Sequence, residues 1–276
     1  GKICERLGIC TQIEFIRFTM NIMKPRLDPS LSAKDLLFDG VPIRVYQPKA
    51  PYAGRRKGMV LFHGGAGLVG TIDFYQDNSN RIAKEADVVL VAVSYGLSPE
   101  HPYPSQYKQC LAATAHFMRN AEVYGVDPSQ IIIFGDSAGG NFTSVVAQQL
   151  TKRPDLPKLR AQALIYAGVQ AMDFNLPSYV QNATMPLLSQ ETVIKFILQY
   201  FIKDPALKSD ILKGSHVPDD FRLKYRKWVS PDNIPEKFML LTSPRFTNSF
   251  QSCWKKPFLP FLLKTTSSSI SPKLSL

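Results

Sequence analysis

The segment from Ile131 to Asn141 constrains this chain more than any other stretch of it. The β-branched run Ile131-Ile132-Ile133 predicts a buried strand, and Phe142 to Leu150 predicts a helix. Between them, Gly135-x-Ser137-x-Gly139 places a serine in a sharp turn of small residues, the setting of a nucleophile elbow. A glycine-rich phosphate loop is the alternative, but no Gly-Lys-Ser/Thr follows. The pattern therefore predicts Ser137 as a nucleophile above a sheet.

Strand-like and helix-like segments alternate on both sides of this turn. Apolar runs at 58–62, 88–93 and 161–166 predict strands, and a shorter alternating run at 43–46 predicts another. Between the central runs, residues 75–85 and 106–119 predict helices. This alternation is typical of an α/β domain whose mostly parallel sheet carries helices on both faces.

A glycine-rich loop, His63-Gly64-Gly65-Ala66-Gly67, follows the first central strand directly. Glycines expose backbone N–H groups with no side chain in the way, which suits the binding of a developing oxyanion. A plain strand-to-loop turn is the alternative, and the elbow later in the chain argues against it. We expect His63 to shape the loop rather than act as the general base. Gly135, Asp136 and Gly139 are expected to shape the elbow in the same way.

Composition sets limits on partners and cofactors. The chain has 276 residues, 45% of them hydrophobic, and a formal net charge of +11, but it carries no nucleic-acid-binding motif. Five basic residues without any acid in the last 34 positions account for much of the excess charge. The four cysteines show no C-x-x-C or zinc spacing, so no metal or cofactor is predicted.

Three further segments complete the expected organisation. Residues 1–40 predict a largely helical lead-in, and residues 41–242 predict the core. Within that core, the proline-interrupted residues 168–235 predict a helical lid whose aromatic side chains either line an acyl pocket or simply pack. Asn182-Ala183-Thr184 is an N-glycosylation sequon there. Residues 243–276, rich in serine, proline and basic side chains, predict a disordered tail.

Three motifs in order resemble one known family over roughly residues 8–242. The loop at 63–67, the block Pro99-Glu100-His101-Pro102-Tyr103-Pro104 and the elbow at 135–141 are similar to the hormone-sensitive-lipase-like branch of the α/β-hydrolases, nearest its arylacetamide deacetylase group. The resemblance implies a serine carboxylesterase acting on a small ester, amide or lipid. It also implies an oxyanion hole from Gly64, Gly65 and Ala138, and anchoring of intact relatives to the endoplasmic reticulum membrane on its luminal face.

The sequence departs from that family in three places. Ala66 stands for the usual third glycine, and Gly96 replaces an arginine expected to form an internal ion pair. After the apolar segment 238–242, where the family places the aspartate and histidine of its triad, neither residue type occurs. A last strand and helix are therefore expected to be missing. The second interpretation is a catalytically impaired form that binds a lipid or acyl ligand, unless His101 or His216 substitutes as base.

Overall fold

A computed structural model describes residues 2–22, 25–185 and 188–229. Within it the chain divides into two compact units: residues 1–169 with 196–203 form the first, and residues 170–195 with the chain from 204 onward form the second. The apolar segment 238–242 and the tail 243–276, both subjects of sequence-based expectations, lie outside the described residues.

A six-stranded sheet forms the first unit, in the spatial order β1-β2-β4-β3-β5-β6. β4, β3, β5 and β6 pair parallel with one another, whereas β2 pairs antiparallel with both β1 and β4. The mostly parallel sheet predicted from the sequence is confirmed. The strands are β1 (Leu31–Phe38), β2 (Val41–Pro48), β3 (Arg56–Phe62), β4 (Val89–Val93), β5 (Val126–Asp136) and β6 (Ala161–Ile165).

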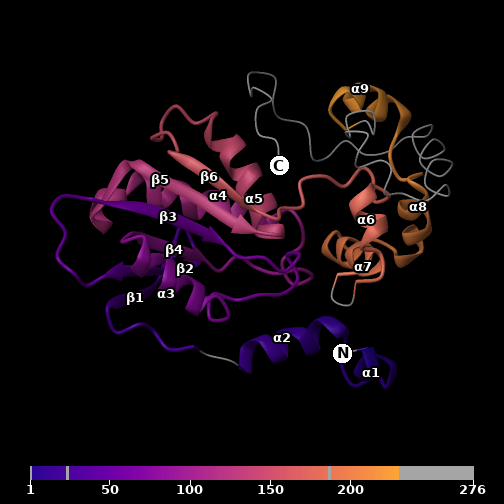
Figure 1. The fold of residues 1–276 in the computed structure, drawn as a ribbon, viewed down its shortest axis with the longest axis horizontal. Helices are drawn as coiled ribbons and strands as arrows, with labels where there is room; N and C mark the ends of the chain where they lie inside the picture. Colours follow the sequence, from indigo (N-terminus) through magenta and orange to yellow (C-terminus); the bar gives the residue numbers. More distant parts are fainter. Residues whose placement is uncertain (1, 23–24, 186–187, 230–276) are drawn as a thin grey trace. The chain divides into compact units, whose positions relative to one another are not determined.

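Helices cover both faces of this sheet, as Figure 1 shows. The burial of β4 reflects its position between two helical layers, because all five of its residues are buried. Val89, Val91 and Val93 pack with residues of α4 and α5, while Leu90 and Ala92 pack with Ala83 of α3. Alternate residues of a strand point to opposite faces, so a continuous apolar run is what a strand between two helical layers requires. The helices of this unit are α1 (Lys2–Arg6), α2 (Gln12–Ile22), α3 (Gln76–Glu85), α4 (Ser105–Arg119), η1 (Ala121–Tyr124) and α5 (Ala138–Leu150).

The expected helical lead-in over residues 1–40 is wrong at its C-terminal end. α1 and α2 are helical, but Leu31–Phe38 is the edge strand β1, paired with β2 through Phe38 and Val41. The cause is the dipeptide Asp39-Gly40, in which both residues have positive φ (49° and 82°). Such dipeptides form the two-residue turns of β-hairpins. The Asp-Gly signal was present in the sequence and predicts this hairpin.

The second unit is helical in its described part. Its helices are α6 (Pro177–Gln181), most of α7 (Gln190–Tyr200), η2 (Pro205–Leu207), α8 (Lys208–Lys213) and α9 (Asp219–Val229). The last turn of α7 and the residues up to Lys203 belong to the first unit instead. The helical character expected for 168–235 is present, whereas its role as a lid stays a prediction.

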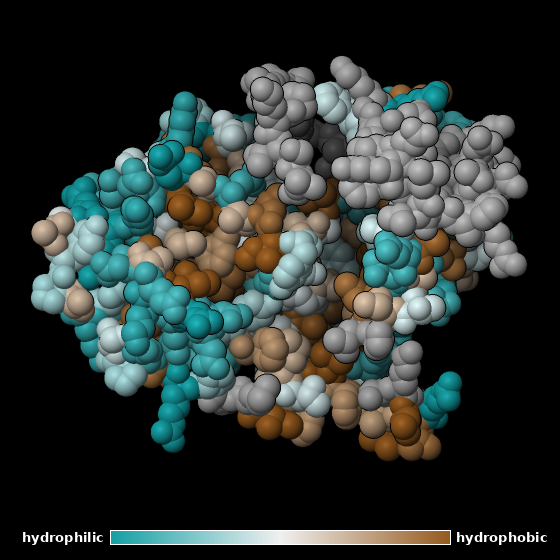
Figure 2. Space-filling model, in the orientation of Figure 1, coloured by the Kyte–Doolittle hydropathy of each residue, from teal (hydrophilic) through white to brown (hydrophobic). Residues whose placement is uncertain are grey.

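The N-terminal helices expose large apolar side chains. Ile3, Leu7 and Phe18 are between 65% and 74% exposed. Figure 2 shows hydrophobic (brown) surface in the area of α1 and α2 at the bottom of the view. Ile13, by contrast, is buried and packs against Leu68 and Val69, which directly follow the glycine-rich loop at 63–67. In the described ranges, no helix is both long and apolar enough to cross a bilayer.

Candidate active site

Ser137 lies in the turn between β5 and α5, with φ 52° and ψ −118°. A positive φ is rare for a residue with a Cβ and persists only where the surrounding structure imposes it. Here the Ser137 N–H donates to Ile165 O of β6 at 2.9 Å, and its carbonyl accepts from Asn141 N at 3.1 Å. The backbone of the serine is therefore held from two neighbouring elements. Among the described residues its hydroxyl makes no hydrogen bond.

Glycines make this turn possible because the backbone of β3 lies against it. A Cβ on Gly139 would stand 2.0 Å from Phe62 O and 2.5 Å from His63 O, and one on Gly135 would stand 2.5 Å from Phe62 O. Neither oxygen can withdraw without breaking the sheet, since both belong to backbone. The Gly135-x-Ser137-x-Gly139 spacing is thus required by the close approach of two main chains.

Asp136 connects the elbow to the glycine-rich loop. Its Oδ1 accepts from Gly64 N at 2.9 Å, and its Oδ2 accepts from the Tyr75 hydroxyl at 2.7 Å and, more weakly, from the Tyr166 hydroxyl at 3.4 Å. Gly64 N also donates to Tyr75 Oη at 3.0 Å. The Gly64 N–H is thus committed to a carboxylate and a phenol, which argues against the expectation that Gly64 supplies an oxyanion donor.

His63 orients the next peptide. Its ring is buried and stacked on Tyr95 at a centroid distance of 4.2 Å, and Nδ1 lies 2.8 Å from Gly64 O. Burial lowers the pKa of His63 to about 4, so the ring is neutral near pH 7 and its Nδ1–H donates to that carbonyl. In a planar trans peptide the C=O and N–H point in opposite directions. The Gly65 N–H therefore points away from His63.

The following peptide is fixed in the same manner. Gly65 O accepts from Leu68 N at 2.9 Å and from Val69 N at 3.0 Å, which turns the Ala66 N–H to the opposite side. In the described part of the chain, the N–H groups of Gly65, Ala66 and Ala138 donate no hydrogen bond. The Ala66 N–H is therefore a further candidate donor, which the sequence does not reveal because no local signal distinguishes it from the N–H of Gly64.

The histidines proposed as substitute bases have other partners. The exposed His101 places its ring against Gly96, where a Cβ would stand 2.4 Å from it. His116, which was not proposed as a base, pairs with Asp39 at 2.8 Å, and neither this ring nor that of His101 hydrogen-bonds to Ser137 among the described residues. In the second unit, the partly buried His216 directs Nε2 to Ala171 O at 3.1 Å, and burial lowers its pKa.

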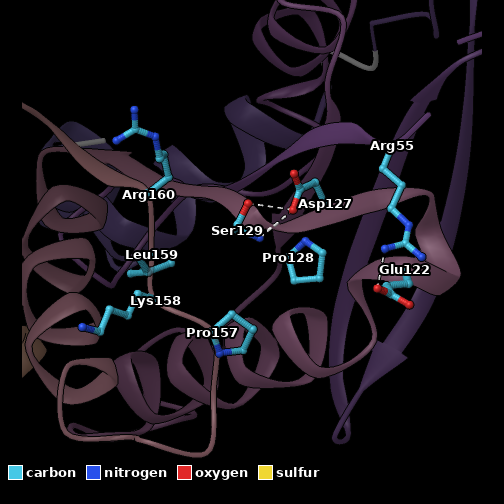
Figure 3. A pocket seen from close by; sticks show the side chains of 9 residues that line it. All are labelled: Arg55, Glu122, Asp127, Pro128, Ser129, Pro157, Lys158, Leu159 and Arg160. Carbon is cyan, nitrogen blue, oxygen red and sulfur yellow. Dashed lines mark hydrogen bonds and ion pairs between the residues drawn. The ribbon is translucent and has the colours of Figure 1, made fainter. Parts of the chain in front are cut away.

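An open hollow of about 680 Å³ lies at the other end of β5. Figure 3 shows that Lys158 and Arg160 point in different directions, while Arg55 pairs with Glu122 and Ser129 with Asp127. The basic groups do not converge, so the hollow offers no anion site. Its lining residues are Arg55, Glu122, Asp127, Pro128, Ser129, Pro157, Lys158, Leu159 and Arg160. The described residues also contain no group of three metal-ligating side chains.

Comparison with known proteins agrees with this geometry. Residues 59–215 match a family model described as alpha/beta hydrolase fold. Arylacetamide deacetylase-like 4 of Homo sapiens is 42% identical over 86% of this chain and 58% of its own length, and arylacetamide deacetylase of Oryctolagus cuniculus is 37% identical over 85% and 61%. A solved hyperthermophilic esterase from Pyrobaculum calidifontis is 25% identical over 76% of this chain and 71% of its own, with a TM-score of 0.63. The chain thus spans about three fifths of these curated relatives.

Proposed function

The chain belongs to the α/β-hydrolase fold family, and from that premise we propose that it is a serine carboxylic-ester hydrolase with Ser137 as its nucleophile. One observation carries the proposal. Ser137 is held at φ 52° between β5 and α5, beside a loop whose Gly65 and Ala66 N–H groups are uncommitted among the described residues. Structural strain of this kind at a single polar residue is typical of active sites.

The proposed reaction proceeds through an acyl-enzyme. The Ser137 hydroxyl loses its proton to a base and attacks the carbonyl carbon of the ester, so that the carbonyl oxygen becomes an oxyanion. The N–H groups of Gly65, Ala66 and Ala138 donate to that oxygen, and loss of one such donor costs about 10²–10³ in rate. As the tetrahedral adduct collapses, the C–O bond to the leaving group breaks and the base returns its proton to that oxygen, so that the alcohol departs. Water then gives a proton to the base, attacks the acyl-enzyme, and releases the acid as Ser137 regains a proton.

The substrate class is part of the proposal. The names of the curated relatives contain "arylacetamide deacetylase", and that of the solved relative contains "esterase". A small amide fits the first name and a small ester the second, and a lipid ester is proposed from the resemblance of the three motifs alone. Naming one substrate requires turnover measurements over a panel of acyl chain lengths.

A second candidate function rests on the histidines. Three of the four histidines of the chain, His63, His101 and His116, lie in the same unit as Ser137, and none hydrogen-bonds to it. A serine without a base is a poor nucleophile, although oxyanion stabilisation and binding alone can leave about 10³–10⁴ over water. The alternative is a protein that binds an acyl ligand and turns it over slowly or not at all.

A fluorophosphonate probe separates the two candidates. Under the first, the full chain is labelled stoichiometrically and Ser137→Ala abolishes labelling. Ser129→Ala, which removes an exposed hydroxyl at the opposite end of β5, leaves labelling unchanged. Under the second, a folded sample resists covalent labelling yet still binds a non-reactive phosphonate ester of the same chain length. Labelling that survives Ser137→Ala contradicts the assigned nucleophile.

The compartment is likewise a proposal, supported by the family resemblance of the three motifs. We propose the luminal face of the endoplasmic reticulum, with membrane association of the intact protein. Asn182 provides the reporter, because it is exposed in the turn after α6, as is Thr184. Cellular protein that shifts in mass on endoglycosidase treatment, and no longer does so as Asn182→Gln, supports a luminal location. Unglycosylated cellular protein argues against it.

A further inference from the structure

Arg17 of α2 reaches three separate segments with one guanidinium. Its Nε donates to Leu68 O at 2.7 Å, Nη2 donates to Ser98 O at 2.7 Å, and Nη1 and Nη2 bind the Glu100 carboxylate at 2.6 and 3.1 Å. The side chain is 21% exposed, so the ion pair is partly shielded from water. Arg17 is the main reason that the pKa of Glu100 lies below its usual range.

The bond to Leu68 O acts on the glycine-rich loop. Leu68 O and the Val69 N–H belong to one peptide, and that N–H donates to Gly65 O. Gly65 O and the Ala66 N–H belong to another. Two planar peptides therefore connect the guanidinium to the Ala66 N–H. The Leu68–Val69 peptide is held by hydrogen bonds at both ends, and the Gly65–Ala66 peptide is held through its carbonyl oxygen alone.

The apolar face of α2 presses on the same loop. Ile13 is buried against Leu68 and Val69, with Ile16, Met20 and Tyr200 around them. The loop is also held from the opposite side, where Ser98 N donates to Gly67 O at 2.9 Å and Arg17 binds Ser98 O. Arg17 thus closes a ring of contacts formed by α2, the loop at 63–70 and the segment at 98–100.

We propose that Arg17 is a positioning residue, which fixes the Gly65–Ala66 peptide in the orientation that an oxyanion requires. The inference rests on the proposed function of Ser137 only for its catalytic consequence. Lysine does not replicate the arrangement, because a single ammonium lacks the planar fork that reaches several acceptors at once.

The first measurement does not depend on activity. Hydrogen exchange of the full chain should show amides in the peptide covering 64–70 exchanging about ten times faster in Arg17→Gln, with those of 131–136 unchanged. Glu100→Gln leaves the bonds to Leu68 O and Ser98 O and should show a smaller increase. Arg6→Gln removes an exposed charge from α1 and is the matched control, with no change expected. Unaltered exchange at 64–70 in Arg17→Gln overturns the proposal.

The second measurement is the rate constant of fluorophosphonate labelling of Ser137. Misplacement of a catalytic group by about 1 Å can cost about 10²-fold, so Arg17→Gln should label between about ten and a hundred times more slowly. Arg17→Lys, which retains the charge and the stem, should recover the thermal midpoint but not the labelling rate. Full recovery of labelling by Arg17→Lys shows that only charge or stability matters and overturns a positioning role.

The exchange and labelling measurements together distinguish a failure of the Ser137 proposal from a failure of the Arg17 proposal. If wild-type Ser137 is not labelled at all, the proposed nucleophile fails, while exchange at 64–70 still decides whether Arg17 holds the loop. If labelling is present and Arg17→Gln changes exchange without changing the labelling rate, Ser137 stands and the positioning role is refuted. Arg17→Lys covers the case in which Arg17→Gln does not fold.

Discussion

Different interactions stabilise the two ends of β5. At its carboxyl end, main chains approach within van der Waals contact, and the peptides after β3 are held by partners such as the partly buried Asp136 and the buried His63. At its amino end, an open hollow is bordered by charged side chains that pair in water, Arg55 with Glu122 among them. The difference indicates that substitutions at the first end disturb backbone geometry, whereas those at the second exchange one solvated contact for another.

Glycine substitutions test this contrast most strongly. Gly139→Ala forces a Cβ to within 2.0 Å of Phe62 O, so we expect a loss of at least about 3 kcal/mol in the free energy of unfolding. At Gly125, just before β5, an added Cβ would have no atom within 4 Å. Gly125→Ala therefore costs only the strain of a non-glycine residue at φ +70°, about 1–2 kcal/mol. Denaturant titration measures both. Equal losses would contradict the proposed difference between the ends.

An aspartate at each end provides the second test. Asp136→Asn keeps the size of the side chain but presents an N–H₂ group to one of its donors. We expect a loss of about 1.5–3 kcal/mol, because hydrogen bonds to a charged group are replaced. Asp127→Asn affects only an exposed turn to Ser129 and should change stability much less. A larger effect at Asp127 would reverse the comparison.

Acid sensitivity is the third test and concerns His63. Its pKa is about 4 when folded and near 6.5 in an unfolded chain, so below pH 6.5 the unfolded state binds the extra proton. The contribution of the neutral His63 ring to the free energy of unfolding is therefore fully present above pH 6.5. It is lost as the pH falls towards 4, by about 1.4 kcal/mol per pH unit.

His63→Asn preserves an N–H donor near Gly64 O and removes the titrating ring. Between pH 6.5 and 4.5 its free energy of unfolding should fall less steeply than that of the wild type, as measured by urea titration at each pH. Parallel curves for the two proteins would show that His63 does not titrate in this range. The matched control is His116→Asn, which changes a partly buried histidine of α4 that pairs with Asp39.

The smallest effect is expected at the hollow. The side chains of Arg55 and Glu122 are 49% and 59% exposed, and exposed ion pairs contribute about 0.2–1 kcal/mol. A double-mutant cycle with Arg55→Gln and Glu122→Gln should yield a coupling energy in that range, and it should decrease in high salt. A coupling energy as large as the stability loss expected for Asp136→Asn would contradict the proposed difference between the two ends of β5.

Periodicity and chain adjacency let the sequence alone establish the alternation of strands and helices and the serine turn. The run Ile131–Ile133, the small residues at 135–140 and the helix after them are neighbours in the chain, so local preferences suffice. The Asp39-Gly40 hairpin was equally available to sequence reasoning. The two positive φ angles of this turn follow from residues adjacent in the chain, so local preference suffices for the β1–β2 hairpin as well.

Only the tertiary structure decided which amides are available to an oxyanion. Gly64, Gly65 and Ala66 are chemically similar neighbours, yet Gly64 N is taken by Asp136, which lies 72 residues away in sequence. The orientation of the other two depends on His63, Leu68 and Val69 and, through Leu68 O, on Arg17 from a separate helix. The direction of an N–H follows from the partner of the adjoining carbonyl, and those partners are brought together only by folding.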